Sequence, residues 1–218
     1  MLSAREYMKK DTQRGSAVVN VLRSDSIISV GKEYLELGID AVMESGALKD
    51  IPFVNSIAGI FGAVGIVKDQ LLTNKLLSFF SELAIITQEE RNNMIDKLNA
   101  DNQFSGRVGA TIIEILDRME SERKPELAAK CFIAYAREKI TFDELRRVLF
   151  ALEKIPTFDI DKVENFAKIN IEESVKMDEF VLLAFVNAGL GKNNGGLDGG
   201  AILPTKLCQV FVSVITNA

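Results

Sequence analysis

The side chains that most enzymes use for proton transfer and nucleophilic attack are scarce in this sequence. Histidine is absent from all 218 residues, which excludes Ser-His-Asp and Cys-His nucleophilic systems and removes the commonest metal ligand. The two cysteines, Cys131 and Cys208, lie far apart in apolar helical patterns, where thiols usually pack as small buried side chains. They have no metal-ligand spacing, and no disulfide is expected. We therefore expect no catalytic residue, no metal site and no cofactor.

A phosphate-binding loop is the other chemistry to weigh. Residues 189–200 are rich in glycine and include Lys192, and glycine amides with a lysine are what phosphate groups need. The segment lacks the Gly-x-x-x-x-Gly-Lys-Ser/Thr spacing and follows a helical pattern rather than a strand. We interpret it as the turn of a hairpin.

The most distinctive segment is the uncharged run 51–67, bounded by Asp50 and Lys68. Its small residues recur at three- and four-residue spacing, which lets a second helix approach closely. The run is shorter than the roughly 20 residues that cross a bilayer. It fits a helix buried in a bundle or a conditional membrane insertion. The residues expected to contact a membrane or a partner are Phe53, Ile57, Gly59, Ile60, Phe61, Gly62, Val64 and Gly65.

Apolar residues recur at helical spacing along most of the chain, which predicts a mostly α fold. Two capping boxes, Thr87 with Glu90 and Thr141 with Glu144, mark helix starts. The expected helices are 24–46, 52–83, 87–98, 108–119, 124–135, 142–155, 161–166 and 177–188, followed by a short strand at 201–203 and a helix or strand at 205–215.

The pattern divides at Pro156. We predict a multi-helix bundle domain over 1–155 and a small C-terminal unit over 156–218. In that unit a helix, a glycine hairpin and a final helix follow one another, as they do around the wing of a winged-helix unit. The predicted fold is therefore a helical bundle with a winged-helix-like appendage.

The charge distribution bears on the partner. A net charge of −5 disfavours a protein that coats nucleic acid. Local binding could still use four basic residues, Arg137, Lys139, Arg146 and Arg147, although the expected wing offers only Lys192 and Lys206. The first ten residues carry charges where a signal peptide needs its apolar segment, which predicts a cytoplasmic protein, with membrane association through 51–67 as a further expectation.

Two blocks carry a family resemblance. Residues 51–98 run from the apolar stretch into Thr-Gln-Glu-Glu-Arg at 87–91. Residues 104–150 include Lys-Pro-Glu-Leu at 124–127 and Ala-Tyr-Ala-Arg at 134–137. Over 51–150 the chain resembles an uncharacterised family of bacterial α-helical proteins. The resemblance implies a bacterial source and a helical core, and it assigns no activity and no functional residue.

These observations favour a non-enzymatic bacterial helical interaction protein with a protein partner or self-association. Its specific role would be that of a membrane-associating stress or phage-defence effector acting through residues 51–67. The alternative is a nucleic-acid-binding regulator that uses the C-terminal winged-helix-like unit. No small-molecule ligand is indicated.

Overall fold

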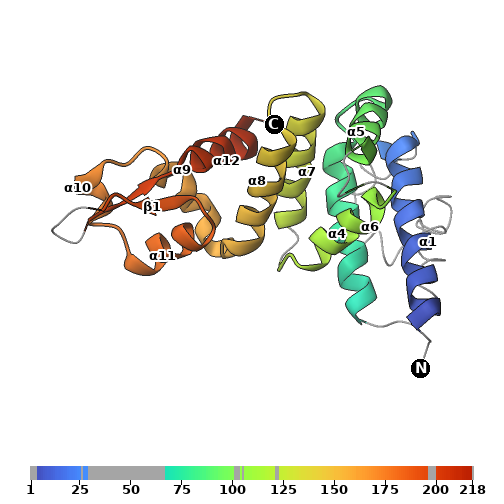
Figure 1. The fold of residues 1–218 in the computed structure, drawn as a ribbon, viewed down its shortest axis with the longest axis horizontal. Helices are drawn as coiled ribbons and strands as arrows, with labels where there is room; N and C mark the ends of the chain where they lie inside the picture. The colour runs from blue at the N-terminus through green and yellow to red at the C-terminus, as the bar shows by residue number, and fades with distance from the viewer. Residues whose placement is uncertain are drawn as a thin grey trace. The chain divides into compact units, whose positions relative to one another are not determined.

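The computed structural model describes residues 4–25, 27–28, 67–100, 104, 106–120, 123–195 and 200–217. These residues are mostly helical, as the apolar spacing predicts (Figure 1). The chain divides into two compact units, Met1–Ala129 and Lys130–Ala218, with the division inside helix α7 (Arg123–Ala136). The predicted C-terminal unit at 156–218 lies within the second of these units, which also includes the helix before it.

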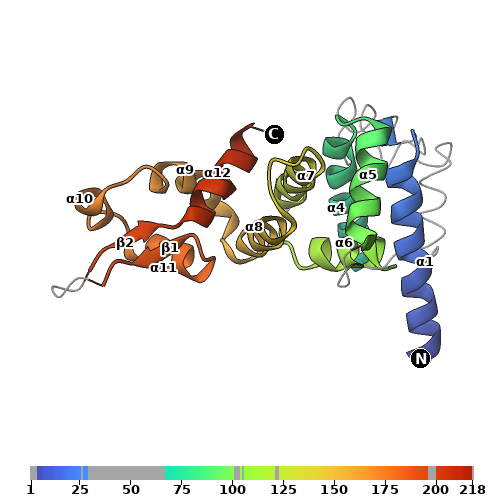
Figure 2. The ribbon, with the colours of Figure 1, turned by 45° about the horizontal axis from the view of Figure 1, so that its top comes forward.

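The first unit is built from α1 (Ala4–Arg23), α4 (Val67–Leu83), α5 (Gln88–Ala100) and α6 (Val108–Asp117). Helix α6 packs against α1, α4 and α5, and α1 also packs against α5 (Figure 2). The core of the unit is made of large apolar side chains from all four helices, including Leu22, Leu76, Phe79, Phe80, Leu98, Ile112 and Leu116.

The predicted helix at 52–83 is confirmed in its second half as α4, and its first half lies outside the described residues. The predicted helix at 24–46 also lies mostly outside them. The sequence pattern did not predict α1, although Val18 and Leu22 are buried one turn apart.

A buried arginine joins the end of α1 to the turn between α4 and α5. The side chain of Arg91, on α5, is fully buried. Its Nε donates to the carbonyl oxygen of Leu22 at 2.8 Å, its Nη2 to that of Ser24 at 3.0 Å, and its Nη1 to that of Ile86. Burial lowers the pKa of the guanidinium, and the carboxylates of Asp25 and Glu90 oppose that shift.

The guanidinium is well matched to this position. The three acceptors are carbonyl oxygens at the end of α1 and in the α4–α5 turn, and one planar cation supplies a donor to each. A positive charge at helix C-termini is also favoured by the helix dipole. Arg91 therefore holds two chain segments, Leu22–Ser24 and Ile86, at one point.

Two glycines allow α1 and α6 to come into backbone contact. A Cβ atom placed on Gly109 would lie 1.9 Å from the carbonyl oxygen of Gly15. A Cβ atom placed on Gly15 would lie 2.8 Å from the backbone nitrogen of Ala110. The two helices can adopt this distance only because neither residue has a side chain.

Both predicted capping boxes are present. The Thr87 backbone N–H donates to Glu90 Oε2 at 2.7 Å, and the Glu90 N–H donates to Thr87 Oγ1 at 3.2 Å at the start of α5. Thr141 and Glu144 make the same pair of bonds at the start of α8 (Phe142–Lys154). These side chains satisfy backbone donors that a helix N-terminus otherwise leaves unpaired, so both helices begin where the sequence indicates.

We expect Thr141→Ala to lower the free energy of unfolding by about 1 kcal/mol at pH 7, the usual effect of losing an N-cap hydroxyl. The Thr141 N–H and hydroxyl donate to the Glu144 carboxylate and hold its pKa below the ordinary 4.5. That carboxylate therefore stabilises the fold above pH 4.5, and its contribution is lost as pH falls through the lower folded-state pKa.

The difference between wild type and Thr141→Ala should accordingly shrink in acid. Urea titrations at several pH values between 3 and 7 measure it. Thr141→Ser keeps the hydroxyl and should behave like the wild type. An equal loss in both variants would contradict this account of the cap.

The second unit contains α8, the 3₁₀ helix η2 (Thr157–Lys162), α9 (Val163–Phe166), α10 (Ile171–Ser174), α11 (Glu179–Asn187), β1 (Gly191–Asn193), β2 (Ile202–Pro204) and α12 (Lys206–Asn217). The predicted helix at 142–155 is confirmed as α8, and its apolar side, with Leu145, Val148, Leu149 and Leu152, is buried. Phe166 and Phe185 meet in the core with ring centres 4.7 Å apart. Helix α12 packs on α8, α9 and β2.

The glycine-rich segment is a hairpin, as predicted. Strands β1 and β2 pair antiparallel, with Lys192 opposite Leu203 (Figure 2). Thr205 closes the hairpin, since its N–H donates to the Leu190 carbonyl at 2.8 Å and its hydroxyl to the Gly189 carbonyl at 2.9 Å. The predicted strand at 201–203 is thus β2, and the segment at 205–215 is helix rather than strand.

Candidate functional site

The segment on which the sequence-based function depends lies outside the described residues, apart from Val67 at the start of α4. The eight residues predicted to contact a membrane or a partner, Phe53, Ile57, Gly59, Ile60, Phe61, Gly62, Val64 and Gly65, are all outside them. Within the described part of the chain, no helix combines the length and the apolarity needed to cross a bilayer. Membrane association and a role as a stress or phage-defence effector therefore stay predictions, as does a cytoplasmic location.

The cysteines are placed as expected for packing residues. Cys131 and Cys208 are both free and fully buried. Burial raises the pKa of each thiol to about 12, so neither is a thiolate nucleophile near neutral pH. Across the described ranges, no three Cys, Asp or Glu side chains come together as metal ligands.

Asparagine side chains in the hairpin brace its turn. Asn193 Oδ1 accepts from the Gly195 N–H at 2.8 Å, and Asn194 Oδ1 accepts from the Ala201 N–H at 2.8 Å. Gly195 has a φ of +73°, which a residue with a side chain rarely adopts. These acceptors are used within the loop, which supports the interpretation of this segment as a structural turn.

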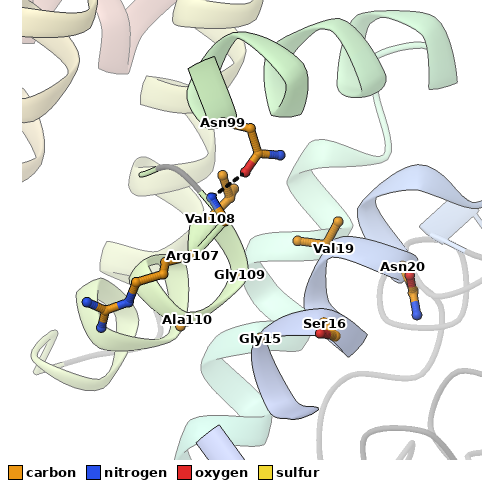
Figure 3. A pocket seen from close by; sticks show the side chains of 10 residues that line it. Gly15, Ser16, Val19, Asn20, Asn99, Arg107, Val108, Gly109 and Ala110 are labelled. Carbon is orange, nitrogen blue, oxygen red and sulfur yellow. Dashed lines mark hydrogen bonds between the residues drawn. The ribbon is translucent and has the colours of Figure 1, made fainter. Parts of the chain in front are cut away.

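A pocket of about 610 Å³ lies where α1 crosses the start of α6 (Figure 3). Ser16, Val19 and Asn20 line it from α1, and Asn99 and Arg107 line it from the other side. Its polar groups are partly engaged: Asn99 Oδ1 accepts from the Gly106 N–H at 3.3 Å, and Arg107 Nη2 lies 3.4 Å from Glu114 Oε1.

The pocket offers little reactive chemistry. Its described lining includes one charged side chain, Arg107, which is exposed and points away from α1 (Figure 3). No carboxylate or thiol is among its described lining residues, so these bring together no nucleophile with a general base. Gly15 and Gly109, where the two backbones meet, are also among its lining residues.

The second unit carries a surface of a different kind on α11. Phe180, Leu183 and Val186 follow one another at three-residue spacing, and their side chains are 81%, 51% and 39% exposed. On the opposite side of the same helix, Val181, Leu182 and Phe185 are buried in the core. We call the exposed stripe, Phe180 with Leu183 and Val186, the α11 face.

Such a helix is unusual at a surface. A helix that packs against a core on one side normally presents polar residues to water on the other, and a helix apolar on all sides is normally covered. Further exposed apolar side chains precede it, with Ile171 at 53% and Val175 at 66%. The sequence analysis missed this face, because an apolar stretch without polar positions does not indicate which side is buried.

The N-terminus of α11 is closed by its own side chain. Asp178 Oδ1 accepts from the N–H groups of Phe180 at 2.9 Å and Val181 at 3.2 Å. A carboxylate therefore occupies the place that a phosphate group takes when it binds a helix N-terminus. Two backbone N–H groups at the start of α11 are thus already hydrogen-bonded to a carboxylate.

The four basic residues proposed for nucleic-acid binding are exposed. They are distant from the hairpin in the sequence and belong to other elements. Arg137 and Lys139 are in the turn after α7, and Arg146 and Arg147 are on α8. None is on α11 or on either strand. These four residues and the β1–β2 hairpin therefore belong to different elements.

No family model, curated protein or solved structure matches this chain. The resemblance over residues 51–150 accordingly stays a prediction.

Proposed function

We propose that this chain is a non-enzymatic interaction protein that binds another polypeptide through the α11 face. The observation that supports the proposal most is that α11 is apolar on both sides while one side is open to water. Exposed apolar patches bounded by charged groups are typical of sites where proteins associate. Phe180 would be the anchor, because a large aromatic side chain with a rigid ring contributes most at such contacts.

We further propose that α11, the β1–β2 hairpin and α12 form a winged-helix-like unit adapted to bind protein. In this arrangement α11 occupies the position of the helix that contacts the ligand. Its exposed positions include no cation, since Glu179 is the charged residue on this helix. A phosphate backbone requires cations there.

The same features weigh against the nucleic-acid alternative. Asp178 already caps the helix start that would face a phosphate, and Glu179 follows it. The hairpin contributes Lys192 alone on its described strands. A regulator of this kind would have to use Arg146 and Arg147 on α8.

Photo-crosslinking tests the proposed function. A photoreactive phenylalanine analogue at position 180 should give a discrete covalent adduct with a polypeptide in the cells that make the chain. The adduct should be lost in a Leu183→Asp background, because a carboxylate in the middle of the stripe opposes desolvation.

The matched control carries the same analogue at Lys168, an exposed position of the same unit beside Glu164. Position 168 should give no such adduct. Equal labelling from positions 168 and 180, or no adduct from position 180, would contradict the proposal.

A further inference from the structure

The outer side of α8 carries a second exposed aromatic ring in the same unit. Phe150 is 51% exposed. Its neighbours on the helix surface, three and four residues away, are Arg146, Arg147, Glu153 and Lys154. Lys154 Nζ lies 5.5 Å from the centre of the Phe150 ring and 3.0 Å from Glu153 Oε1. We call this set of residues, Arg146, Arg147, Phe150 and Lys154, the α8 face.

The surroundings of the α11 face have the opposite charge. Between residues 171 and 187 there are four carboxylates, Glu172, Glu173, Asp178 and Glu179, against one cation, Lys176. Asp178 and Glu179 directly precede Phe180 on the chain. The unit thus presents an apolar stripe with an acidic end. On another helix it presents an exposed ring whose neighbours are three cations, Arg146, Arg147 and Lys154, and one carboxylate, Glu153, which pairs with Lys154.

We propose that the α11 face binds the α8 face of a second copy of this chain. This inference rests on the proposed function and names the partner. Opposite charges across the contact favour this pairing, whereas two α11 faces would bring together two surfaces whose surroundings both carry an excess of carboxylates. An exposed aromatic ring on each side supplies the apolar contact area.

The pairing has a consequence for assembly. The two faces are different surfaces, so the contact is heterologous, and a dimer still has one free α8 face on one copy and one free α11 face on the other. Association should therefore continue beyond the dimer into a ring or an open chain as concentration rises. Salt should weaken it, because the charges at the contact edge are solvent-exposed.

Sedimentation velocity over a range of concentrations tests the proposal. The average mass of the wild type should rise above the 24.1 kDa of one chain. Phe180→Ser/Leu183→Ser removes the α11 face and Arg146→Glu/Arg147→Glu reverses the α8 face. Each double variant alone should dissociate roughly tenfold or more readily, as expected when interface anchors are lost.

The deciding sample is the equimolar mixture of the two double variants. Each chain then supplies the face that the other lacks, so a 1:1 complex should form and grow no further. Lys168→Glu, a charge reversal on the same unit outside both faces, should associate like the wild type. Circular dichroism of every variant should match the wild type, since all substituted side chains are exposed.

Two results would overturn the inference: a wild type that stays monomeric up to its solubility limit, or a mixture that fails to restore the complex. The crosslinking test separates these failures from that of the proposed function. An adduct from position 180 with a different polypeptide would leave the proposed function standing and overturn self-association. No adduct from position 180 would overturn both.

Discussion

Replacing Arg91 by methionine should lower the free energy of unfolding of the first unit by about 3 to 5 kcal/mol. Methionine keeps much of the buried volume but removes the donors to the carbonyl oxygens of Leu22, Ser24 and Ile86. Hydrogen bonds from a charged group contribute about 1.5–3 kcal/mol each, and buried acceptors without a donor are costly. Against a total of about 5–15 kcal/mol for a typical domain, much of the stability of the unit would be lost.

Urea denaturation followed by hydrogen exchange of the α1 amides measures this effect. Arg23→Met is the matched control, because Arg23 also joins α1 to α5, through Asp96, but at the surface. Exposed ion pairs contribute about 0–1 kcal/mol. The loss of stability in Arg91→Lys should lie between those of Arg91→Met and Arg23→Met, because lysine keeps the charge but lacks the planar guanidinium group. If Arg91→Met were no more destabilising than Arg23→Met, the structural role assigned to the buried guanidinium would be wrong.

Gly109→Ala should have the second largest effect and should separate α1 from α6. Alanine is favoured over glycine in a helix by about 1 kcal/mol. Here the new Cβ would lie 1.9 Å from the Gly15 carbonyl oxygen, so a backbone must move. Overpacking typically costs about 1–3 kcal/mol and occasionally more. Because the obstacle is backbone, we expect a net loss of about 2 kcal/mol or more.

A comparison of the stability losses of Gly109→Ala and Gly15→Ala tests this explanation within the same contact. Gly15→Ala brings its Cβ only to 2.8 Å from the Ala110 nitrogen, so it should destabilise less than Gly109→Ala. Asn93→Ala, at an exposed position of α5, should change stability by less than about 0.5 kcal/mol. Thermal unfolding of the three variants measures the order. A Gly109→Ala variant more stable than the wild type would show that the helices can separate without loss.

The features that the sequence predicts are those decided by nearby residues. Thr141 and Glu144 are three residues apart, and their capping box is present as expected. The buried side of α8 can be predicted because the apolar residues of this helix lie on one side and its polar residues on the other. The glycines after α11 mark a hairpin because few other residues take a positive φ.

The features that the sequence does not predict depend on residues far apart in the chain. Nothing near Arg91 indicates that its side chain is buried, because its acceptors include Leu22, 69 residues earlier. Gly15 and Gly109, which also meet, are even further apart in the chain. On α11, Phe180 and Phe185 are alike in type, and only the packed unit decides that the first is exposed and the second buried.

The position of Arg91 and Gly109 in the chain affects how the first unit is assembled during synthesis. Helix α1 is synthesised before its partners in these two contacts. Arg91 follows Leu22 by 69 residues, and Gly109 is on α6. At about 5–20 residues per second, that delay lasts roughly 3 to 20 s. During that interval the nascent helix has neither contact available to it. These two contacts can therefore form only after Arg91 and Gly109 have been synthesised.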